Sequence, residues 1–322
     1  MYARMIKIGI IGAGHLGKIH ISLLKEIKEF DVIGFYDKNK EVSESVSTDF
    51  GIKSYPNAEE LIKQCDAIDV VSPTPFHFDY AKLVIKAGKH VFIEKPVTSH
   101  PDEAKTLVRI AYEAGIVAQV GHVEQFNPAV LAAKPFITRP VYINAERLAV
   151  YNPRGTDVSV VLDLMIHDID LVLSMVKSDI RKIQANGSPV ICETDDIAHA
   201  RIDFNNGAIA NITVSRVALS NKRTLEVFQK ENFLNIDLLN KTLTKVELKR
   251  EHTLDVYESV IAVRDDKSLV KQPILVKPVN AIKHEFELFA ESILNNRKAV
   301  ISLDDAYLTM KVIQQIMDGM NK

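Results

Sequence analysis

The sequence predicts an α/β protein in which a doubly wound parallel sheet is followed by an α+β domain with a largely antiparallel, open sheet. Strand-like and helix-like segments alternate over residues 6–120, as parallel α/β sheets require. A glycine-rich turn follows the first strand, and beyond residue 123 short strands follow one another through turns. A length of 322 residues suits two domains. We place the boundary between residues 122 and 123, where the pattern changes.

The elements of the first domain follow from hydrophobic periodicity. Residues 6–11 form an apolar run that predicts a buried strand, and apolar residues from Ile19 to Ile27 then recur at helical spacing. The same alternation predicts a strand at 32–36, a helix at 57–64, a strand at 67–71, a helix at 77–87, a strand at 90–93, a helix at 101–114 and a strand at 116–120.

The second domain is predicted to be mostly strands. Asn205-Asn206-Gly207 between two apolar runs is a hairpin signal. The expected strands are 141–150, 183–191, 198–204, 208–217, 224–229, 233–238 and 242–248, with helices at 159–176, 280–295 and 303–319.

Composition excludes several classes of protein. The chain has 40 basic and 42 acidic residues, so no nucleic-acid partner is expected. Its two cysteines, Cys65 and Cys192, have neither disulfide-scaffold nor zinc-site spacing. No targeting signal or membrane span is visible, so we expect a cytoplasmic protein without a membrane partner.

The turn after the first strand has the form of a dinucleotide-binding turn, and it identifies the first domain as a Rossmann domain. Gly12 permits the tight turn, Gly14 lets the backbone approach a pyrophosphate, and Gly17 allows the helix to pack on the sheet. His15 and Leu16 lie between them, at a helix N-terminus that offers amide donors to phosphates.

Asp37 lies twenty residues beyond Gly17, at the end of the second predicted strand. An acidic side chain there binds the adenosine ribose hydroxyls and repels a 2′-phosphate. The sequence therefore favours NAD over NADP, while the adjacent Lys38 keeps NADP open.

Two groups of residues are candidates for chemistry. Glu94-Lys95 directly follows a strand of the nucleotide-binding sheet, which suggests a lysine facing a nicotinamide, although such pairs are common on surfaces. Asp163 and His167 are four residues apart in a predicted helix and share a face. Neutral histidine suits removal of a hydroxyl proton near neutral pH, although a helix histidine is also compatible with plain packing.

Two further residues are candidate substrate ligands. Arg154 lies in a turn-rich loop before the helix of His167, where an arginine binds a diphosphate or is simply solvated. Asn127 lies just beyond the last parallel strand, and ligands collect at the carboxyl ends of such strands.

Four motifs in order resemble the Gfo/Idh/MocA oxidoreductases over essentially the whole chain. They are Gly12-Ala13-Gly14-His15-Leu16-Gly17-Lys18-Ile19-His20, Ser72-Pro73-Thr74-Pro75-Phe76-His77, Glu94-Lys95-Pro96, and residues 163–170, which read Asp-Leu-Met-Ile-His-Asp-Ile-Asp.

This resemblance implies that residues 1–122 bind NAD(P) and that residues 123–322 bind substrate and form a homodimer or homotetramer. It implies that Ser72, Thr74, His77, Glu94 and Lys95 line the nicotinamide nucleotide. The family's catalytic lysine, aspartate and histidine match Lys95, Asp163 and His167. His167 is then the general acid/base, Lys95 stabilises charge on the reacting oxygen, and Asp163 orients the sugar or tunes its neighbours.

Hydride transfer to a nicotinamide needs no metal, so we expect none at His167, Asp168 and Asp170. Residues 121–130 and 161–170 resemble the nucleotide-sugar branch of the family, which predicts oxidation of the 3-hydroxyl of a UDP-N-acetylhexosamine. Gln125 and Asn280 depart from that branch, where arginine and glutamate are usual. The alternatives are a dehydrogenase of free sugars or inositol, and a dinucleotide-binding sensor without catalysis.

Overall fold

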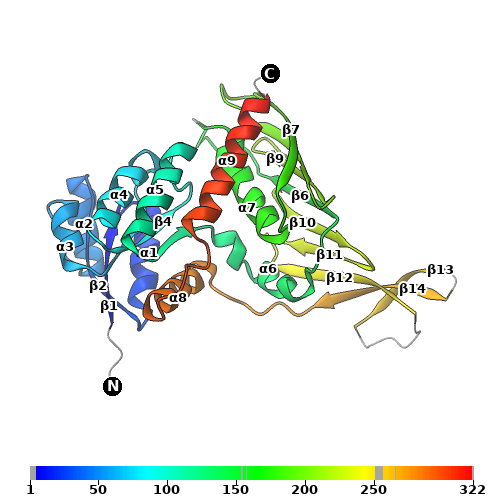
Figure 1. Cartoon of the computed structure of the whole chain (residues 1–322), viewed down its shortest axis with the longest axis horizontal. Coiled ribbons are helices and arrows are strands. Elements are labelled where there is room, and N and C mark those ends of the chain that lie inside the picture. Colours follow the sequence, from blue (N-terminus) through cyan, green and yellow to red (C-terminus); the bar gives the residue numbers. More distant parts are fainter. Residues whose placement is uncertain (1–4, 154, 157, 251–256, 265, 321–322) are drawn as a thin grey trace. The chain divides into compact units, whose positions relative to one another are not determined.

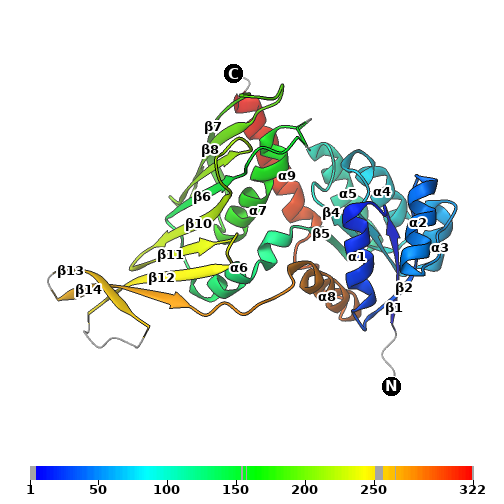
Figure 2. The ribbon, with the colours of Figure 1, turned by 180° about the vertical axis from the view of Figure 1, so that it is seen from behind.

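A computed structural model describes residues 5–153, 155–156, 158–250, 257–264 and 266–320. The chain forms two compact units (Figures 1 and 2). Unit 1 contains the residues up to Val123 together with Asn280–Lys311, and unit 2 contains Glu124–Val279 together with the residues from Val312 onward.

Unit 1 is built on a parallel sheet of five strands in the order β2-β1-β3-β4-β5. All four neighbouring pairs are parallel, which confirms the doubly wound sheet predicted from the sequence. The strand order reverses between β1 and β3, and ligands bind at such a switch point. The strands are β1 (Ile6–Ile11), β2 (Phe30–Tyr36), β3 (Ala67–Val70), β4 (His90–Glu94) and β5 (Ala118–Gly121).

Helices accompany this sheet in two groups: α1 contacts α2 and α8, while α4 contacts α3 and α5. Their bounds are α1 (His15–Lys25), α2 (Lys40–Phe50), α3 (Ala58–Gln64), α4 (His77–Lys86), α5 (Pro101–Ala114) and α8 (Ala281–Leu294), with a 3-10 turn, η1, at Thr74–Phe76. The sequence analysis missed α2, because Val46 is its one buried residue and it shows little apolar periodicity. Its ends are nevertheless well marked, since Asn39 accepts hydrogen bonds from two backbone N–H groups and Gly51 has a φ of 60°.

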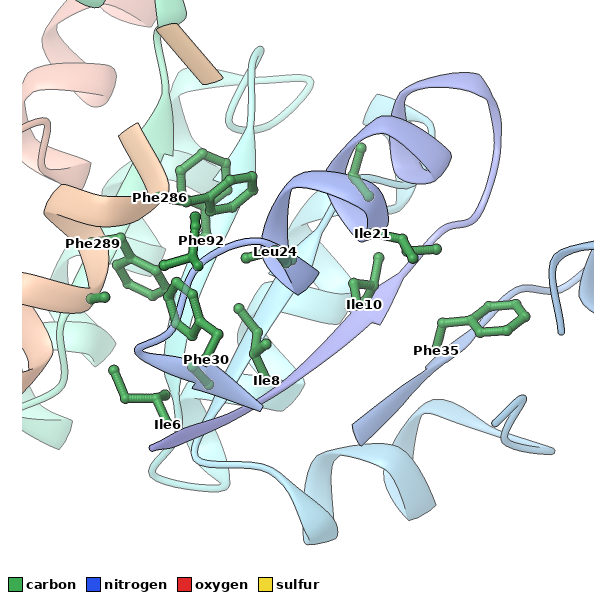
Figure 3. Close-up of a cluster of buried hydrophobic side chains, with 14 of the residues drawn as sticks. Ile6, Ile8, Ile10, Ile21, Leu24, Phe30, Phe35, Phe92, Phe286 and Phe289 are labelled. Atoms are coloured by element: carbon green, nitrogen blue, oxygen red, sulfur yellow. The ribbon is translucent and has the colours of Figure 1, made fainter. Parts of the chain in front are cut away.

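The core of unit 1 includes a helix from near the end of the chain. Phe286 and Phe289 of α8 pack against Phe92 of β4, with ring centroids 4.6 and 5.8 Å apart, and Figure 3 shows them beside Ile8 and Leu24. Burial of these aromatic side chains supplies the reason for α8 to pack here. The division placed at residue 122 by sequence therefore differs from the observed one, in which Asn280–Lys311 belongs to unit 1.

Unit 2 is built on a nine-stranded sheet in the order β13-β14-β12-β11-β10-β6-β9-β8-β7. Among its described pairs β6 and β9 are parallel and the others antiparallel, so the prediction of a largely antiparallel sheet is confirmed. The strands are β6 (Tyr142–Leu148), β7 (Ile180–Ser188), β8 (Ile197–Phe204), β9 (Ile209–Ser215), β10 (Lys222–Gln229), β11 (Asn232–Asp237), β12 (Thr242–Lys249), β13 (Ser259–Arg264) and β14 (Lys267–Ile274). β13 and β14 were not predicted from the sequence.

The helices α6 (Pro128–Ala133) and α7 (Ile166–Met175) lie on one face of this sheet (Figures 1 and 2). The single helix predicted over 159–176 is instead a π-helical turn, η4 (Val161–Met165), that continues into α7. Such π-helical turns are frequent at functional sites. The last helix is α9 (Leu303–Met320), and in the described part of the chain no helix is long and apolar enough to cross a membrane.

Candidate active site

The turn after β1 is closed by two glycines that leave no room for side chains. Gly12 has a φ of 102°, and a Cβ placed on it would lie 2.6 Å from the backbone nitrogen of Ser72. A Cβ on Gly17 would lie 2.2 Å from the carbonyl oxygen of Gly12. These contacts bring the ends of β1 and β3 together at the switch point of the sheet.

The other residues of the turn are open. Gly14, His15 and Leu16 are exposed at the N-terminus of α1, and a Cβ on Gly14 would meet no atom within 4 Å. The free amide groups of a helix N-terminus bind phosphate. The turn therefore fits a pyrophosphate, as the sequence predicts.

Asp37 closes the turn from the end of β2. Its Oδ2 accepts a hydrogen bond of 2.7 Å from the N–H of Ala13, and its Oδ1 accepts one of 2.8 Å from the N–H of Asn39. The half-buried carboxylate is thus held at a pocket of about 400 Å³. The lining of the pocket combines the ends of β1, β2 and β3 with aromatic side chains, and includes Gly12, Asp37, Lys38, Ser72, Tyr36, Phe76 and Tyr80.

The aromatic side chains suit an adenine base. The rings of Tyr36 and Tyr80 lie edge to face with centroids 6.3 Å apart, and Lys38 Nζ lies 5.6 Å from the centroid of Phe76. Burial and the neighbouring Tyr36 raise the pKa of Tyr80 to about 12, so this side chain is neutral in the pocket. Sequence reasoning did not identify these aromatic residues, although Phe76 lies within a quoted motif.

Replacing Asp37 by serine is expected to lower the affinity for NAD by about tenfold, because the ribose hydroxyls lose a charged hydrogen-bond acceptor. The affinity for NADP should become similar to that for NAD, because the carboxylate no longer repels the 2′-phosphate. Lys38 is then placed to pair with a 2′-phosphate. The ratio of kcat/KM for the two cofactors checks this. Asn57→Ala, which removes the cap of α3 at a residue that does not line this pocket, should leave the ratio unchanged.

Two loops that follow β3 and β4 are joined by His77. Its Nε2 lies 2.6 Å from the carbonyl oxygen of Ser72, and its Nδ1 lies 2.8 Å from that of Pro96. The ring is buried, and burial lowers the pKa of His77. His77 therefore holds these two loops together, while Ser72 and Thr74 remain partly exposed.

Lys95 is half-buried at the end of β4, and its backbone N–H donates a 2.9 Å hydrogen bond to Glu94 Oε2. His122 lies just past β5 and is buried. It is close enough to the Lys95 ammonium for that charge to change its pKa. Burial and Lys95 together lower the pKa of His122 to about 3, so its ring stays neutral. Glu94, Lys95 and His122 are thus neighbours within unit 1.

In unit 2 the polar residues of η4 and α7 fall into two classes. Asp163 and His167 are half-buried, whereas Asp168 and Asp170 are buried and bound by other side chains. The Nε2 of Gln125 lies 3.1 and 3.0 Å from the two carboxylate oxygens of Asp170. Asp163 and His167 are therefore the members of this segment that can reach a substrate.

Asp168 belongs to a buried ion network. Arg147 of β6 binds it through two hydrogen bonds, Nε–Oδ2 at 2.8 Å and Nη2–Oδ1 at 3.1 Å, and binds Glu124 Oε1 at 3.0 Å. Arg147 is 3% exposed and Asp168 1%. The network fastens α7, and with it the neighbouring His167, to the sheet. Among the described residues no group of three or more His, Cys, Asp or Glu is placed to hold a metal ion.

Asn127 has a structural role in this unit. Its amide nitrogen donates to Glu124 Oε2 and to the carbonyl oxygen of Leu238, and its oxygen caps α6 by accepting from the N–H of Ala129. A contact between Asn127 and a substrate stays a prediction. Arg154 lies outside the described residues, and its predicted role stays a prediction too.

The described part of the loop before η4 is held by Arg216, which the sequence analysis did not single out. This buried guanidinium donates 2.8 Å hydrogen bonds from Nη1 to the carbonyl oxygen of Gly155 and from Nη2 to that of Val158. Its Nε lies 3.1 Å from Asp196 Oδ1. A Cβ placed on Gly155 would lie 3.8 Å from Asp163 Oδ2, so Arg216 fixes a loop that lies against Asp163.

Arg216→Lys is expected to raise the KM for the substrate by about tenfold, because an ammonium group cannot bind both carbonyl oxygens as the planar guanidinium does. The affinity for NADH should not change, since Arg216 belongs to unit 2. Steady-state kinetics and NADH titration check this. The exposed Arg181, 3.7 Å from Asp203, supplies the control Arg181→Lys, which should change neither value.

Comparison with known proteins agrees with both units. The model of the Gfo/Idh/MocA oxidoreductase family with an NAD-binding Rossmann fold matches residues 6–122, and the Gfo/Idh/MocA C-terminal domain matches residues 140–233. UDP-N-acetylglucosamine 3-dehydrogenase of Acidithiobacillus ferrooxidans is 34% identical over 235 residues, which cover 73% of this chain and 74% of the relative.

A solved structure of UDP-N-acetylglucosamine 3-dehydrogenase from Acidithiobacillus ferrooxidans has a TM-score of 0.90 with this chain at 29% identity, covering 98% of this chain and 97% of that one. The NAD-dependent scyllo-inositol 2-dehydrogenase of Bacillus subtilis is 25% identical over 232 residues, covering 66% of this chain and 68% of the relative. Both the fold class and the NAD cofactor predicted from the sequence are confirmed. The chain belongs to the Gfo/Idh/MocA family and is an NAD-dependent oxidoreductase.

Proposed function

We propose that this protein oxidises the 3-hydroxyl of a UDP-N-acetylhexosamine with NAD as hydride acceptor. The observation that carries the proposal is the pair Asp163 and His167, which stay accessible in a segment whose other carboxylates are buried and bound. The relative with 34% identity, which is named UDP-N-acetylglucosamine 3-dehydrogenase, supports the choice of substrate.

His167 takes the proton of the sugar hydroxyl, since a neutral imidazole is a suitable base near neutral pH. Lys95 donates a hydrogen bond to the same oxygen and stabilises the negative charge that develops on it. Asp163 orients the sugar. NAD, when bound at the turn after β1, supplies the hydride acceptor.

The remaining recognition is assigned to residues near this segment. Arg154 binds the diphosphate, and Asn127 contributes at the edge of the substrate site. The open face of the nine-stranded sheet forms the interface of a homodimer or homotetramer. These assignments rest on the family resemblance and on the position of each residue in the sequence.

The test is NAD reduction by the purified protein against UDP-N-acetylglucosamine, other UDP-sugars, free sugars and inositol, with a ketone trap to draw the equilibrium forward. Reduction that requires the UDP group supports the proposal. Turnover with only unlinked sugars or inositol would contradict the proposal. It would favour the second candidate function, a dehydrogenase of free sugars or inositol, which the similarity to scyllo-inositol 2-dehydrogenase supports. Binding of NAD with no turnover in the whole panel would favour a sensor.

A further inference from the structure

Three ionisable side chains form a line inside unit 1, behind the Glu94–Lys95 turn. His20 Nδ1 lies 2.9 Å from Asp69 Oδ2, and His20 Nε2 lies 3.5 Å from Glu94 Oε1. His20 and Asp69 are fully buried, and Glu94 nearly so. On its other oxygen Glu94 accepts the backbone N–H of Lys95, so the line ends at the residue proposed to bind the reacting oxygen.

The geometry constrains where the protons of this line can lie. With a proton on Nδ1 directed at the Asp69 carboxylate, the buried Nε2 lies 3.5 Å from Glu94 Oε1. If neither carried a proton, two lone pairs would oppose each other in a buried site, which is unfavourable. One proton is therefore held in common, either on His20 with Glu94 ionised or on Glu94 with His20 neutral.

We propose that Asp69 and His20 are positioning residues that keep Glu94 ionised, and that Glu94 in turn sets the place and the charge of Lys95 in the proposed reaction. This inference rests on the proposed function for the role of Lys95. It concerns a pair of residues, His20 and Asp69, that the reaction itself does not use.

The surroundings favour the proton on His20. The rings of Phe286 and Phe92 meet its ring edge to face, with centroids 4.9 and 6.2 Å away, so solvent does not compete with Asp69. Burial alone lowers the pKa of His20, but Asp69 and Glu94 outweigh burial and raise it above its ordinary value.

The other charged groups act on Glu94 and its neighbours. Burial raises the pKa of Glu94 to about 6, against the opposing effect of His20 and Lys95, so Glu94 is mostly ionised at neutral pH. The ring of His122 is neutral, since burial and Lys95 lower its pKa more than Asp305 raises it. From α8 the side chain facing His20 is Phe286, while the backbone oxygen of the neighbouring Glu285 accepts a hydrogen bond from Gln119.

Loss of the Glu94 charge would remove an anion from beside Lys95. A nearby anion favours the charged form of a lysine, so its loss lowers the lysine pKa. Glu94→Gln removes the charge directly, whereas Asp69→Asn removes it by letting the shared proton move onto Glu94. Two different substitutions should therefore have the same consequence for Lys95.

The first measurement is long-range ¹H–¹⁵N NMR of the histidine rings in the whole protein, with the His20 signal assigned by its loss in His20→Gln. We expect both ring nitrogens of His20 to be protonated from about pH 6 to 8 in the wild type, where an ordinary histidine becomes neutral. In Asp69→Asn the ring should become neutral within that range. This readout needs no turnover, so it tests the shared proton even if every sugar fails as a substrate.

The second measurement is the pH profile of kcat with the best substrate. Asp69→Asn and Glu94→Gln should both move the alkaline limb to lower pH, by about one unit, and Asp69→Asn should keep the affinity for NADH within about threefold. Asp66→Asn, at the opposite end of β3, is the matched control and should not move it. A neutral His20 in the wild type, or alkaline limbs that stay in place in both variants, would overturn the proposal.

Discussion

Replacing His167 by asparagine is expected to lower kcat by about 10²–10⁴-fold, the usual contribution of a general acid/base. An asparagine amide keeps a hydrogen-bonding group near the sugar hydroxyl, but it cannot accept the proton that must leave as the hydride is transferred. The affinity for NADH should stay nearly constant, because the cofactor residues belong to unit 1 and His167 to unit 2.

The measurement is single-turnover reduction of NAD with the UDP-sugar at several pH values. His284→Asn is the matched control, because this histidine is half-buried like His167 but belongs to α8, 3.5 Å from Glu287, and turnover should remain within about twofold of the wild type. A loss of less than tenfold in His167→Asn would exclude His167 as the general base and direct attention to Asp163.

Replacing Arg147 by methionine is expected to destabilise the protein by about 3–5 kcal/mol, because the buried Asp168 would lose its guanidinium partner and Glu124 would keep as a cation only Arg223, 3.9 Å away. The side chains of Arg147, Asp168 and Glu124 are 3%, 1% and 11% exposed, so water cannot replace the lost contacts. Chemical denaturation followed by circular dichroism measures the change.

Two comparisons make this prediction specific. Arg109→Ala breaks an ion pair with Glu113 whose side chains are 65% and 57% exposed, and should cost only about 0.5 kcal/mol. The triple variant Arg147→Met, Asp168→Leu, Glu124→Leu should recover most of the stability, because apolar side chains replace a buried ion network well. If Arg147→Met lowers the free energy of unfolding as little as Arg109→Ala does, the network does not hold α7 in place.

The sequence was sufficient for the features that depend on local patterns. The apolar strand at 6–11 and the glycines at 12, 14 and 17 predict the nucleotide-binding turn. Gly12 and Gly17 meet close backbone contacts, and Gly14 leaves open space beside the turn. The alternation of apolar residues likewise predicts most strands of unit 2. The accessibility of Asp163 and His167, in contrast to Asp168 and Asp170, required the structure because it depends on which partners approach from other elements.

The signals that sequence reasoning missed are polar residues at inward positions. Arg147 follows Ile143 and Ala145 with a period of two, so it faces the same buried side of β6. Asp69 similarly interrupts the apolar strand β3. Their partners, Asp168 and His20, are distant in sequence, and a single chain does not reveal such pairing.

The two departures from the nucleotide-sugar branch also have structural roles here. Gln125 binds Asp170 inside unit 2, and Asn280 caps α8 by accepting the N–H of Lys283. Both side chains therefore have functions within the fold, and neither departure requires a different substrate.

The composition of unit 1 from two separate stretches has a consequence for synthesis on the ribosome. Phe92 emerges early, whereas its packing partners Phe286 and Phe289 are added only after Glu124–Val279, the main stretch of unit 2, has been translated. At ordinary elongation rates this interval lasts about 10–40 s. During that time the nascent nucleotide-binding half presents an uncovered aromatic surface, so chaperone binding to the unfinished chain should be concentrated there and should end when α8 arrives.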